Sequence, residues 1–209
     1  MKLIKTLLLT ISTICLMLSA AFAETNSQSK ASTSKAKPQK ATFAGGCFWC
    51  MEPPFEKVKG VISVTSGFIG GTSKNPTYKD VASGKTNHKE AVEIIYNPKL
   101  VSYENLIEIF WKQVDPLDAG GQFVDRGAHY TTGVFYHDQN QKKIALKSKN
   151  NLEKSKKLKG KIVTKITKAT TFYLAEDYHQ DYYKKNPVRY KLYRYGSGRD
   201  KRLKELWGK

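Results

Sequence analysis

The sequence predicts an α+β fold, a single domain in which helices pack on a small, mostly antiparallel sheet. Three observations predict it. Short apolar or alternating runs end at glycine or proline, helical patterns with capping residues lie between them, and no strict strand–helix repeat links the two. Hydrophobic residues make up 40% of the 209-residue chain, which is enough for the core of one domain.

The first element is a short strand in KATFAGG (40–46), which ends at two glycines. A helix then begins in CFWCMEPPFEKV (47–58). Pro53 and Pro54 are tolerated only in the first turn of a helix, where their missing N–H groups cost little. The two prolines therefore place Cys47 close to the N-terminus of this helix.

Two strands follow. VISVTSGFIGG (61–71) alternates and leaves the sheet through glycines, and AVEIIYNP (91–98) is ended by Asn97 and Pro98. The segment between them, SKNPTYKDVASGKTNHKE (73–90), is predicted to be a long polar loop.

The next helix is predicted at Tyr103–Val114. Ser102 can cap it, and its apolar residues recur at helical spacing. These residues are Leu106, Ile107, Phe110, Trp111 and Val114. A glycine-bearing loop over 115–129 and a strand in YTTGVFYH (130–137) come next.

Asp138 with Gln141 resembles a capping box for a lysine-rich helix that reaches about Leu158. KIVTKITKAT (161–170) is predicted as a further strand. The tail from Ala175 onward is rich in tyrosine and arginine and is expected to be less regular.

The N-terminus resembles a signal peptide. Lys2 and Lys5 precede an apolar run over 7–18, and small residues end at Ala23, where cleavage is expected. The alternative is a membrane anchor, but a span needs about 20 apolar residues. Cleavage also removes Cys15, whose surroundings match a lipidation signal poorly.

Residues Glu24–Lys40 are polar and free of aromatic side chains, so they are predicted to be a disordered linker. The sequence therefore predicts a signal peptide at 1–23, a linker at 24–40 and one domain at 41–209. We expect an exported protein, periplasmic or secreted, with no stable membrane span once the signal is removed.

Positive charge is in large excess. Of 36 lysines and arginines two lie in the predicted signal peptide, which leaves 34 against 18 acids. Between Lys142 and Lys168 the only acid is Glu153. Such a run can bind nucleic acid or an anionic surface, but a solvated helix face that aids solubility is the favoured explanation. No nucleic-acid motif accompanies the charge, so we expect no nucleic-acid partner.

Two cysteines remain in the mature chain, Cys47 and Cys50, separated by Phe48 and Trp49. A C-x-x-C pattern occurs in disulfide staples, zinc half-sites, thioredoxin-like pairs and nucleophiles with a helper. A two-residue loop is too small to stabilise a domain much. Zinc needs four ligands, and the 4 histidines of the chain are scattered. A working redox pair is therefore favoured, with no bound metal.

A helix N-terminus carries partial positive charge and free N–H groups, which lower the pKa of a thiol. Cys47, directly after Gly45 and Gly46, fits a nucleophile in that position. The glycines allow a substrate to approach the backbone closely. Cys50, one turn later, is placed to reach Cys47 once Cys47 has been oxidised.

Three segments carry a family resemblance: GGCFWCMEPPFEKVKGV (45–61), SGFIGGTSKNPTYKDVASGKTNHKEAVEIIYNP (66–98) and AEDYHQDYYKKN (175–186). They resemble the signatures of the peptide methionine sulfoxide reductase A family, in the family's order, over roughly the whole domain. The resemblance implies a ferredoxin-like split β-α-β core. It also implies reduction of the S-epimer of methionine sulfoxide, free or in proteins, as repair of oxidative damage.

The resemblance assigns roles to individual residues. Cys47 matches the nucleophile, which becomes a sulfenic acid, and Glu90 matches the carboxyl that protonates the sulfoxide oxygen. The matched substrate-binding residues are Phe48 and Trp49 for the methyl group, Tyr78 and Tyr130 for the oxygen, and Asp125 for the substrate backbone. Each of these residues also has an ordinary structural explanation, in packing, in a turn or as a surface acid.

Other residues near these motifs are expected to be structural. Glu52 matches a family acid near the nucleophile, and His179 is predicted to pack and hydrogen-bond. The tail carries no cysteine, so recycling by tail cysteines is excluded. Cys50 is therefore the hypothesised resolving residue, which forms a disulfide with Cys47. The chain ends at Lys209, so no fused second reductase domain is expected.

The resemblance implies no bound cofactor and an external thioredoxin-like dithiol as reductant. The expected partners are this reductant and oxidised proteins, and the enzyme is expected to be a monomer. Two other classes remain open. A disulfide oxidoreductase would reduce disulfides but not sulfoxides, and a basic binding protein would bind polyanions with a steep salt dependence.

Overall fold

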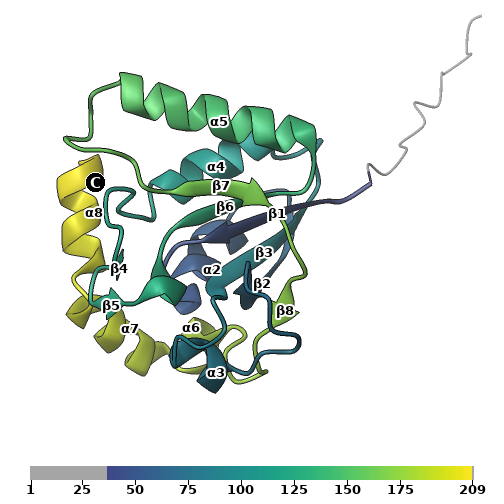
Figure 1. The fold of residues 1–209 in the computed structure, drawn as a ribbon, viewed down its shortest axis with the longest axis vertical. Helices are drawn as coiled ribbons and strands as arrows, with labels where there is room; N and C mark the ends of the chain where they lie inside the picture. The colour runs from purple at the N-terminus through teal and green to yellow at the C-terminus, as the bar shows by residue number, and fades with distance from the viewer. Residues whose placement is uncertain (1–36, 209) are drawn as a thin grey trace, which may run out of the picture. The chain divides into compact units, whose positions relative to one another are not determined.

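The computed structural model describes residues 37–208. The predicted signal peptide at 1–23 and most of the predicted linker at 24–40 lie outside the described residues. The strands are β1 Gln39–Ala44, β2 Val61–Ile69, β3 Lys89–Tyr96, β4 Gly121–Gln122, β5 Asp125–Arg126, β6 Gly133–Tyr136, β7 Lys165–Lys168 and β8 Tyr173–Leu174 (Figure 1). The helices are α2 Phe48–Glu56, α3 Tyr78–Ala82, α4 Tyr103–Trp111, the 3₁₀ helix η1 Ala128–Tyr130, α5 Gln139–Lys154, α6 Tyr182–Lys185, α7 Pro187–Gly196 and α8 Arg199–Trp207.

A six-stranded sheet in the order β7-β6-β1-β3-β2-β8 forms the centre of the domain. All its pairs are antiparallel except β6 with β7. β1 lies between β3 and β6, and Phe43 pairs with Val92 on one side and with Val134 on the other. The α+β prediction, a mostly antiparallel sheet with packed helices, is confirmed.

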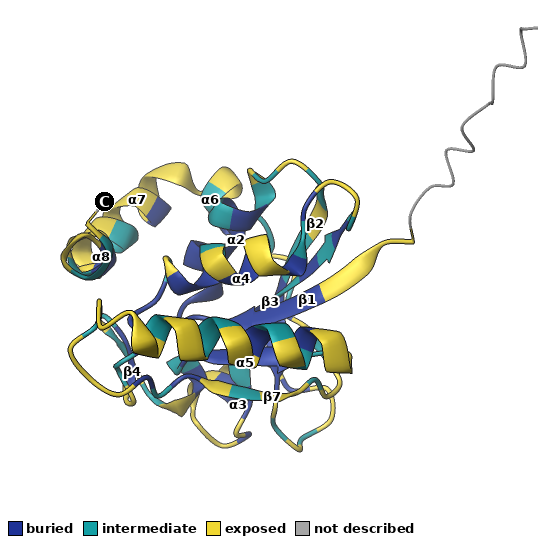
Figure 2. Ribbon diagram, turned by 90° about the horizontal axis from the view of Figure 1, so that it is seen from above, coloured by how far each residue is buried: buried dark blue, intermediate teal, exposed yellow. Residues whose placement is uncertain are grey.

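One face of the sheet is covered by α2, α4 and α5, which lie side by side (Figures 1 and 2). The main core fills the space beneath them, and Phe43 stacks there on Phe55, Tyr103 and Phe110. The outer face of α5 is exposed and carries much of the basic run (Figure 2). The lysines of that helix thus form a solvated face.

Alternation along β3 decides which face Glu90 occupies. Val92, Ile94 and Tyr96 belong to the main core beneath α2, whereas Ala91 belongs to a small cluster on the opposite face. Because side chains alternate along a strand, Glu90 points to the same face as Val92. The strand therefore directs this acid toward α2.

The predicted N-cap residues of two helices are confirmed, but Gln141 does not complete the capping box predicted with Asp138, because its Oε1 accepts from the His137 amide. The Ser102 side chain accepts from the amide of Asn105, and the Asp138 side chain accepts from that of Gln141. Both helices end earlier than predicted, at Trp111 and Lys154 instead of Val114 and about Leu158. Strand β1 begins at Gln39, just before the predicted start of the domain.

Pro53 and Pro54 do not lie in the first turn, as the sequence predicted, but in the second turn of α2. The helix continues through them at the loss of two backbone hydrogen bonds, since proline has no N–H. Its packing on β2 and β3 compensates for that loss. Cys47 nevertheless lies at the helix N-terminus, as predicted, where it is the N-cap residue.

Two segments are more regular than predicted. The polar loop over 73–90 contains α3, whose Thr77 and Asp80 form a reciprocal capping box. The tail, expected to be irregular, folds into α6, α7 and α8. Among the described residues, no helix has both the length and the apolar character to cross a bilayer.

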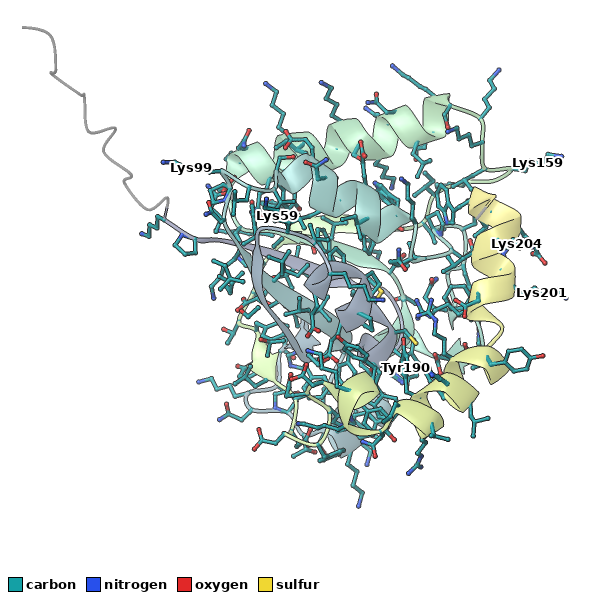
Figure 3. The ribbon with its side chains drawn as sticks, turned by 180° about the vertical axis from the view of Figure 1, so that it is seen from behind. Lys59, Lys99, Lys159, Tyr190, Lys201 and Lys204 are labelled. Carbon is teal, nitrogen blue, oxygen red and sulfur yellow. The ribbon has the colours of Figure 1, made fainter. Side chains whose placement is uncertain are left out.

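The tail helices present their lysines outward. Figure 3 shows Lys201 and Lys204 of α8, and Lys159 after α5, extending from the edge of the domain. Tyr190 of α7 is buried on the inner side. The helices of the tail therefore pack onto the domain through aromatic side chains and leave their lysines in water.

Candidate active site

Cys47 follows the end of β1 and is the N-cap residue of α2. Gly46 just before it has φ of +81°, and a Cβ there would lie 2.7 Å from Cβ of Gln122. The turn therefore requires glycine both for its conformation and for space. Cys47 is 7% exposed, so its thiol lies just below the surface.

Cys50 lies one turn further along α2 and is fully buried, covered by Tyr182 and Tyr190. Its amide donates to the carbonyl oxygen of Cys47 over 3.1 Å. Both cysteines carry free thiols. The two sulfurs are close enough to hydrogen-bond with each other.

Glu90 meets the start of the same helix. Its Oε2 accepts from the amide of Phe48 over 3.1 Å, and the residue is only 1% exposed. Burial raises the pKa of this carboxyl to about 8, although the Phe48 amide opposes the shift. Glu90 is therefore protonated at neutral pH, directly beside Cys47.

Tyr78 from α3 and Tyr130 from η1 bring their hydroxyls together at Glu90. The two hydroxyls hydrogen-bond to each other, and Tyr130 also bonds to the Glu90 carboxyl. Burial raises the pKa of both tyrosines, so both remain donors at physiological pH. These residues are far apart in the sequence, and only the fold joins them.

The aromatic pair Phe48 and Trp49 divides between core and surface. Phe48 is buried, with its ring 4.9 Å from that of His179 and 6.5 Å from that of Tyr78. Trp49 is half-buried and stacks on Tyr182 with ring centroids 3.6 Å apart. Phe48 thus forms an inner wall of the site, and Trp49 reaches its rim.

Asp125 lies in β5 and is half-buried. It accepts a hydrogen bond from the hydroxyl of Tyr193 in α7, and that same hydroxyl bonds to the Cys47 thiol. Burial raises the pKa of Asp125, and the Tyr193 bond partly opposes the shift. Tyr193 thus joins Asp125 to Cys47, and no motif in the tyrosine-rich tail singles it out.

The charge of the cysteine pair differs from the prediction. Burial raises the pKa of Cys47 well above its ordinary value, and Cys50 and Glu90 raise it further. The hydrogen bond from Cys47, helped by Arg199 and Arg194, lowers the pKa of Cys50 to about 6. The helix N-terminus was expected to lower the pKa of Cys47, and burial acts in the opposite direction.

His179 and Glu52 hydrogen-bond to residues around the site and hold its elements together. His179 is buried and accepts from Nε1 of Trp49 over 3.0 Å, which confirms its predicted packing and hydrogen-bonding role. Glu52 accepts from the Ser66 hydroxyl over 2.8 Å and from the Asp181 amide over 3.4 Å. It thereby ties α2 to β2 and to the start of α6.

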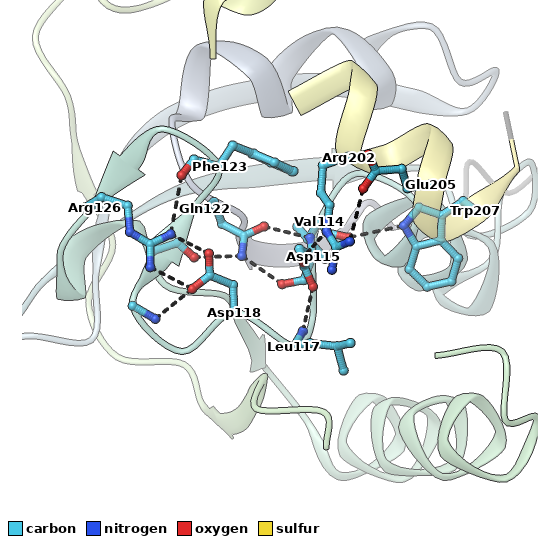
Figure 4. A network of polar contacts seen from close by, with 12 residues as sticks. Val114, Asp115, Leu117, Asp118, Gln122, Phe123, Arg126, Arg202, Glu205 and Trp207 are labelled. Carbon is cyan, nitrogen blue, oxygen red and sulfur yellow. Dashed lines mark hydrogen bonds and ion pairs between the residues drawn. The ribbon is translucent and has the colours of Figure 1, made fainter. Parts of the chain in front are cut away.

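The loop before β5 is held by its own polar network (Figure 4). The Gln122 side chain accepts from the amide of Asp115 and donates to its carbonyl, each over 2.8 Å. Asp115 also accepts from Arg202 of α8 over 2.7 Å. Because Gln122 packs against Gly46, this network braces the turn that carries Cys47.

Two cavities lie away from the predicted site residues. One of about 860 Å³ lies between α4, α5 and the end of α8, and another of about 490 Å³ lies beside Lys89. Neither is lined by a predicted site residue. In residues 37–208 no three histidine, cysteine or acidic side chains gather as a metal site would require.

The fold thus brings all eight predicted site residues to one end of α2 and its surroundings. Sequence reasoning missed Tyr193, Arg194 and Arg199, which all come from the tail. The only available signal for them was the abundance of tyrosine and arginine there.

Comparison with known proteins supports this arrangement. Residues 39–209 match the family model described as "Peptide methionine sulfoxide reductase". The MsrA proteins of Bacillus subtilis and Listeria monocytogenes are each 53% identical, over 82% and 81% of this chain and 97% and 96% of theirs. The crystal structure of reduced Mxr1 from Saccharomyces cerevisiae has a TM-score of 0.68 at 31% identity, over 73% of this chain and 87% of that one. Methionine sulfoxide reductase A of Corynebacterium diphtheriae has a TM-score of 0.65 at 31% identity, over 72% and 76%.

Proposed function

The chain belongs to the peptide methionine sulfoxide reductase A family and reduces the S-epimer of methionine sulfoxide to methionine in protein repair, and we propose that Cys47 is its nucleophile and Glu90 its acid. The observation that carries the proposal is the bond from the Phe48 amide to Glu90. It fixes a protonated carboxyl at the first turn of the helix that Cys47 caps.

In the first step Sγ of Cys47 attacks the sulfoxide sulfur. The Cys47 thiol hydrogen-bonds to the Cys50 thiolate, so Cys50 takes the thiol proton as the attack proceeds. Glu90 gives its proton to the sulfoxide oxygen, which passes to Cys47 as methionine leaves. The products are methionine, a sulfenic acid on Cys47 and a Glu90 carboxylate, which regains a proton from solvent.

The substrate oxygen is held by hydroxyl groups and the methyl group by aromatic rings. Tyr78 and Tyr130 present their hydroxyls beside Glu90, where they can donate to the sulfoxide oxygen. Phe48 and Trp49 supply the apolar wall, where sulfur–aromatic contacts also stabilise the bound side chain. Asp125, the nearest carboxylate on the other side, is the acceptor for an amide of the substrate backbone.

Cys50 resolves the sulfenic acid. Its sulfur attacks Sγ of Cys47, an S–S bond forms, and the oxygen leaves as water. The support is its place one turn along α2 and its hydrogen bond with Cys47. An external dithiol protein of the thioredoxin type then reduces the disulfide by thiol–disulfide exchange.

We also propose that the enzyme acts outside the cytoplasm, because the first 23 residues have the charged, apolar and small-residue regions of a signal peptide. N-terminal sequencing of the protein from an expressing culture tests this. A mature chain that begins at Glu24 supports export, and a chain that begins at Met1 contradicts it.

The proposed chemistry is tested with racemic methionine sulfoxide linked to a chromophore, a dithiol reductant and separation of the epimers on a chiral column. The expected result is loss of the S-epimer alone. Cys47→Ser should lower the rate by about 10³-fold or more, because it removes the nucleophile. A folded Cys47→Ser protein at the wild-type rate would contradict the assignment.

A further inference from the structure

Arg199, the first residue of α8, is a buried cation that the proposed chemistry leaves unused. It is 1% exposed, and its guanidinium lies over the Phe123 ring at 4.4 Å. Its NH1 donates to the carbonyl of Gln113 over 2.8 Å and its NH2 to that of Gly45 over 3.1 Å. Two backbone carbonyls therefore hold the guanidinium, and that of Gly45 lies just before the turn that carries Cys47.

No carboxylate forms an ion pair with Arg199 among the described residues. Its third contact is the Met51 sulfur, at 3.9 Å, and its Nε is buried without a partner. A buried charge without an opposite charge is costly. The neighbouring Arg194 differs, because it pairs with Asp200 over 2.6 Å.

Arg199 contacts Gly45 and Met51, which flank the segment that carries the two cysteines. Its charge favours the thiolate of Cys50 and the carboxylate of Asp125. Asp125 is already satisfied by the hydroxyl of Tyr193. The thiolate of the cysteine pair is therefore the group that can match the charge of Arg199.

We infer that Arg199 is a positioning residue whose buried charge is balanced by the thiolate of the reduced Cys47–Cys50 pair, so that the disulfide has a high reduction potential and is readily reduced. The inference rests on the proposed role of Cys50 as the resolving cysteine. Arg199 acts through the cysteines and touches no substrate.

The balance of the reaction gives the physical reason. The pair starts as one thiol and one thiolate, loses two electrons to the sulfoxide and ends as a neutral disulfide. The sulfoxide oxygen leaves as water with one proton from Cys47 and one from solvent. Arg199 then remains in the same apolar place without an anion, so the oxidised form is destabilised relative to the reduced form.

The test equilibrates the full chain with mixtures of reduced and oxidised dithiothreitol, alkylates free thiols and counts them by peptide mass spectrometry. Peptide mapping keeps Cys15 separate from Cys47 and Cys50. Arg199→Met should shift the equilibrium toward the disulfide by about tenfold or more, which is about 30 mV for a two-electron couple. Arg199→Lys keeps the positive charge, so its equilibrium should lie between those of wild type and Arg199→Met.

Arg202→Met is the matched control. Arg202 is on the same helix, but its side chain is 42% exposed and it pairs with Asp115 and Glu205. The thiol–disulfide equilibrium constant of Arg202→Met should stay within about twofold of the wild-type value, because exposed ion pairs contribute little. A folded Arg199→Met protein whose equilibrium constant also stays within twofold of the wild-type value overturns the inference.

Two further results separate the possible failures. If the wild type forms no Cys47–Cys50 disulfide at all, the proposed role of Cys50 fails first. If Arg199→Met does not fold, denaturant unfolding of reduced and oxidised wild type decides the matter. The reduced form should then be the more resistant of the two, and a more resistant oxidised form overturns the inference.

Discussion

The two cysteines of α2 are three residues apart, yet their surroundings shift their pKa values in opposite directions. Cys47 faces the acid side of the site, where Glu90 raises its pKa. Cys50 faces the tail, where Arg199 and Arg194 lower its pKa. One helical turn thus separates Cys47, which lies beside the proposed acid Glu90, from Cys50, whose thiolate the two arginines favour. Burial alone would have raised the pKa of both thiols.

The largest effect after loss of the nucleophile is expected on the acid side. Glu90→Gln should lower the rate of sulfoxide reduction by about 10²- to 10⁴-fold, because the amide cannot donate an acidic proton. The measurement is steady-state reduction of the S-epimer. A Glu90→Gln protein within twofold of wild type would show that the oxygen is protonated from elsewhere.

The pH dependence sharpens the same point. Burial raises the pKa of Glu90 from 4.5 to about 8, so the protonated acid persists up to that pH. Activity should therefore fall as pH rises through about 8, and Glu90→Gln should lose that alkaline limb. The folded state holds a proton that the unfolded state has released, so the unfolding free energy should also fall as pH rises toward 8. A wild-type rate that stays flat to pH 9 would exclude Glu90 as the acid.

On the thiolate side, Cys50→Ser should separate the two halves of the reaction. One equivalent of methionine should still form in a single turnover, because Cys47 and Glu90 remain. Turnover with a thioredoxin-type protein should fall by about tenfold to 10²-fold, since no disulfide can form for exchange. Wild-type turnover with that reductant would show that Cys50 does not resolve the sulfenic acid.

Tyr193 connects the two sides through its bonds to Asp125 and Cys47. Tyr193→Phe removes the hydroxyl and keeps the ring that packs on Trp49. The rate constant should fall by about tenfold, the size of one lost hydrogen bond to a charged group. Tyr195→Phe is the matched control on the same helix, because Tyr195 is exposed. Equal effects of the two substitutions would show that the Tyr193 hydroxyl has no part in the site.

The smallest effect is expected far from both cysteines. Ser102→Ala removes the side-chain acceptor for the Asn105 amide at the start of α4. The free energy of unfolding should fall by about 1 kcal/mol, as for other lost caps, with the rate unchanged. Denaturant unfolding measures the free energy of unfolding, and the sulfoxide assay measures the rate. A changed rate would show that α4 transmits strain to the site.

Local signals were enough for the parts of the molecule that depend on neighbours in the chain. Ser102 and Asp138 cap the helices that follow them, and Gly46 allows the turn that makes Cys47 an N-cap. The family resemblance supplied Glu90, Tyr78, Tyr130 and Asp125, which the fold gathers around that helix. Composition and spacing could not have done so, because these residues lie on four separate elements.

The sequence by itself thus determined the α+β class and the reaction, and it supplied Cys47 as the proposed nucleophile. Tertiary structure alone decided that the tail is helical, that Pro53 and Pro54 lie inside α2, and that burial raises the pKa of Cys47. Each of these depends on contacts between distant segments, such as Arg199 with Gly45. Burial and charge are properties of the assembled surroundings, so no local pattern encodes them.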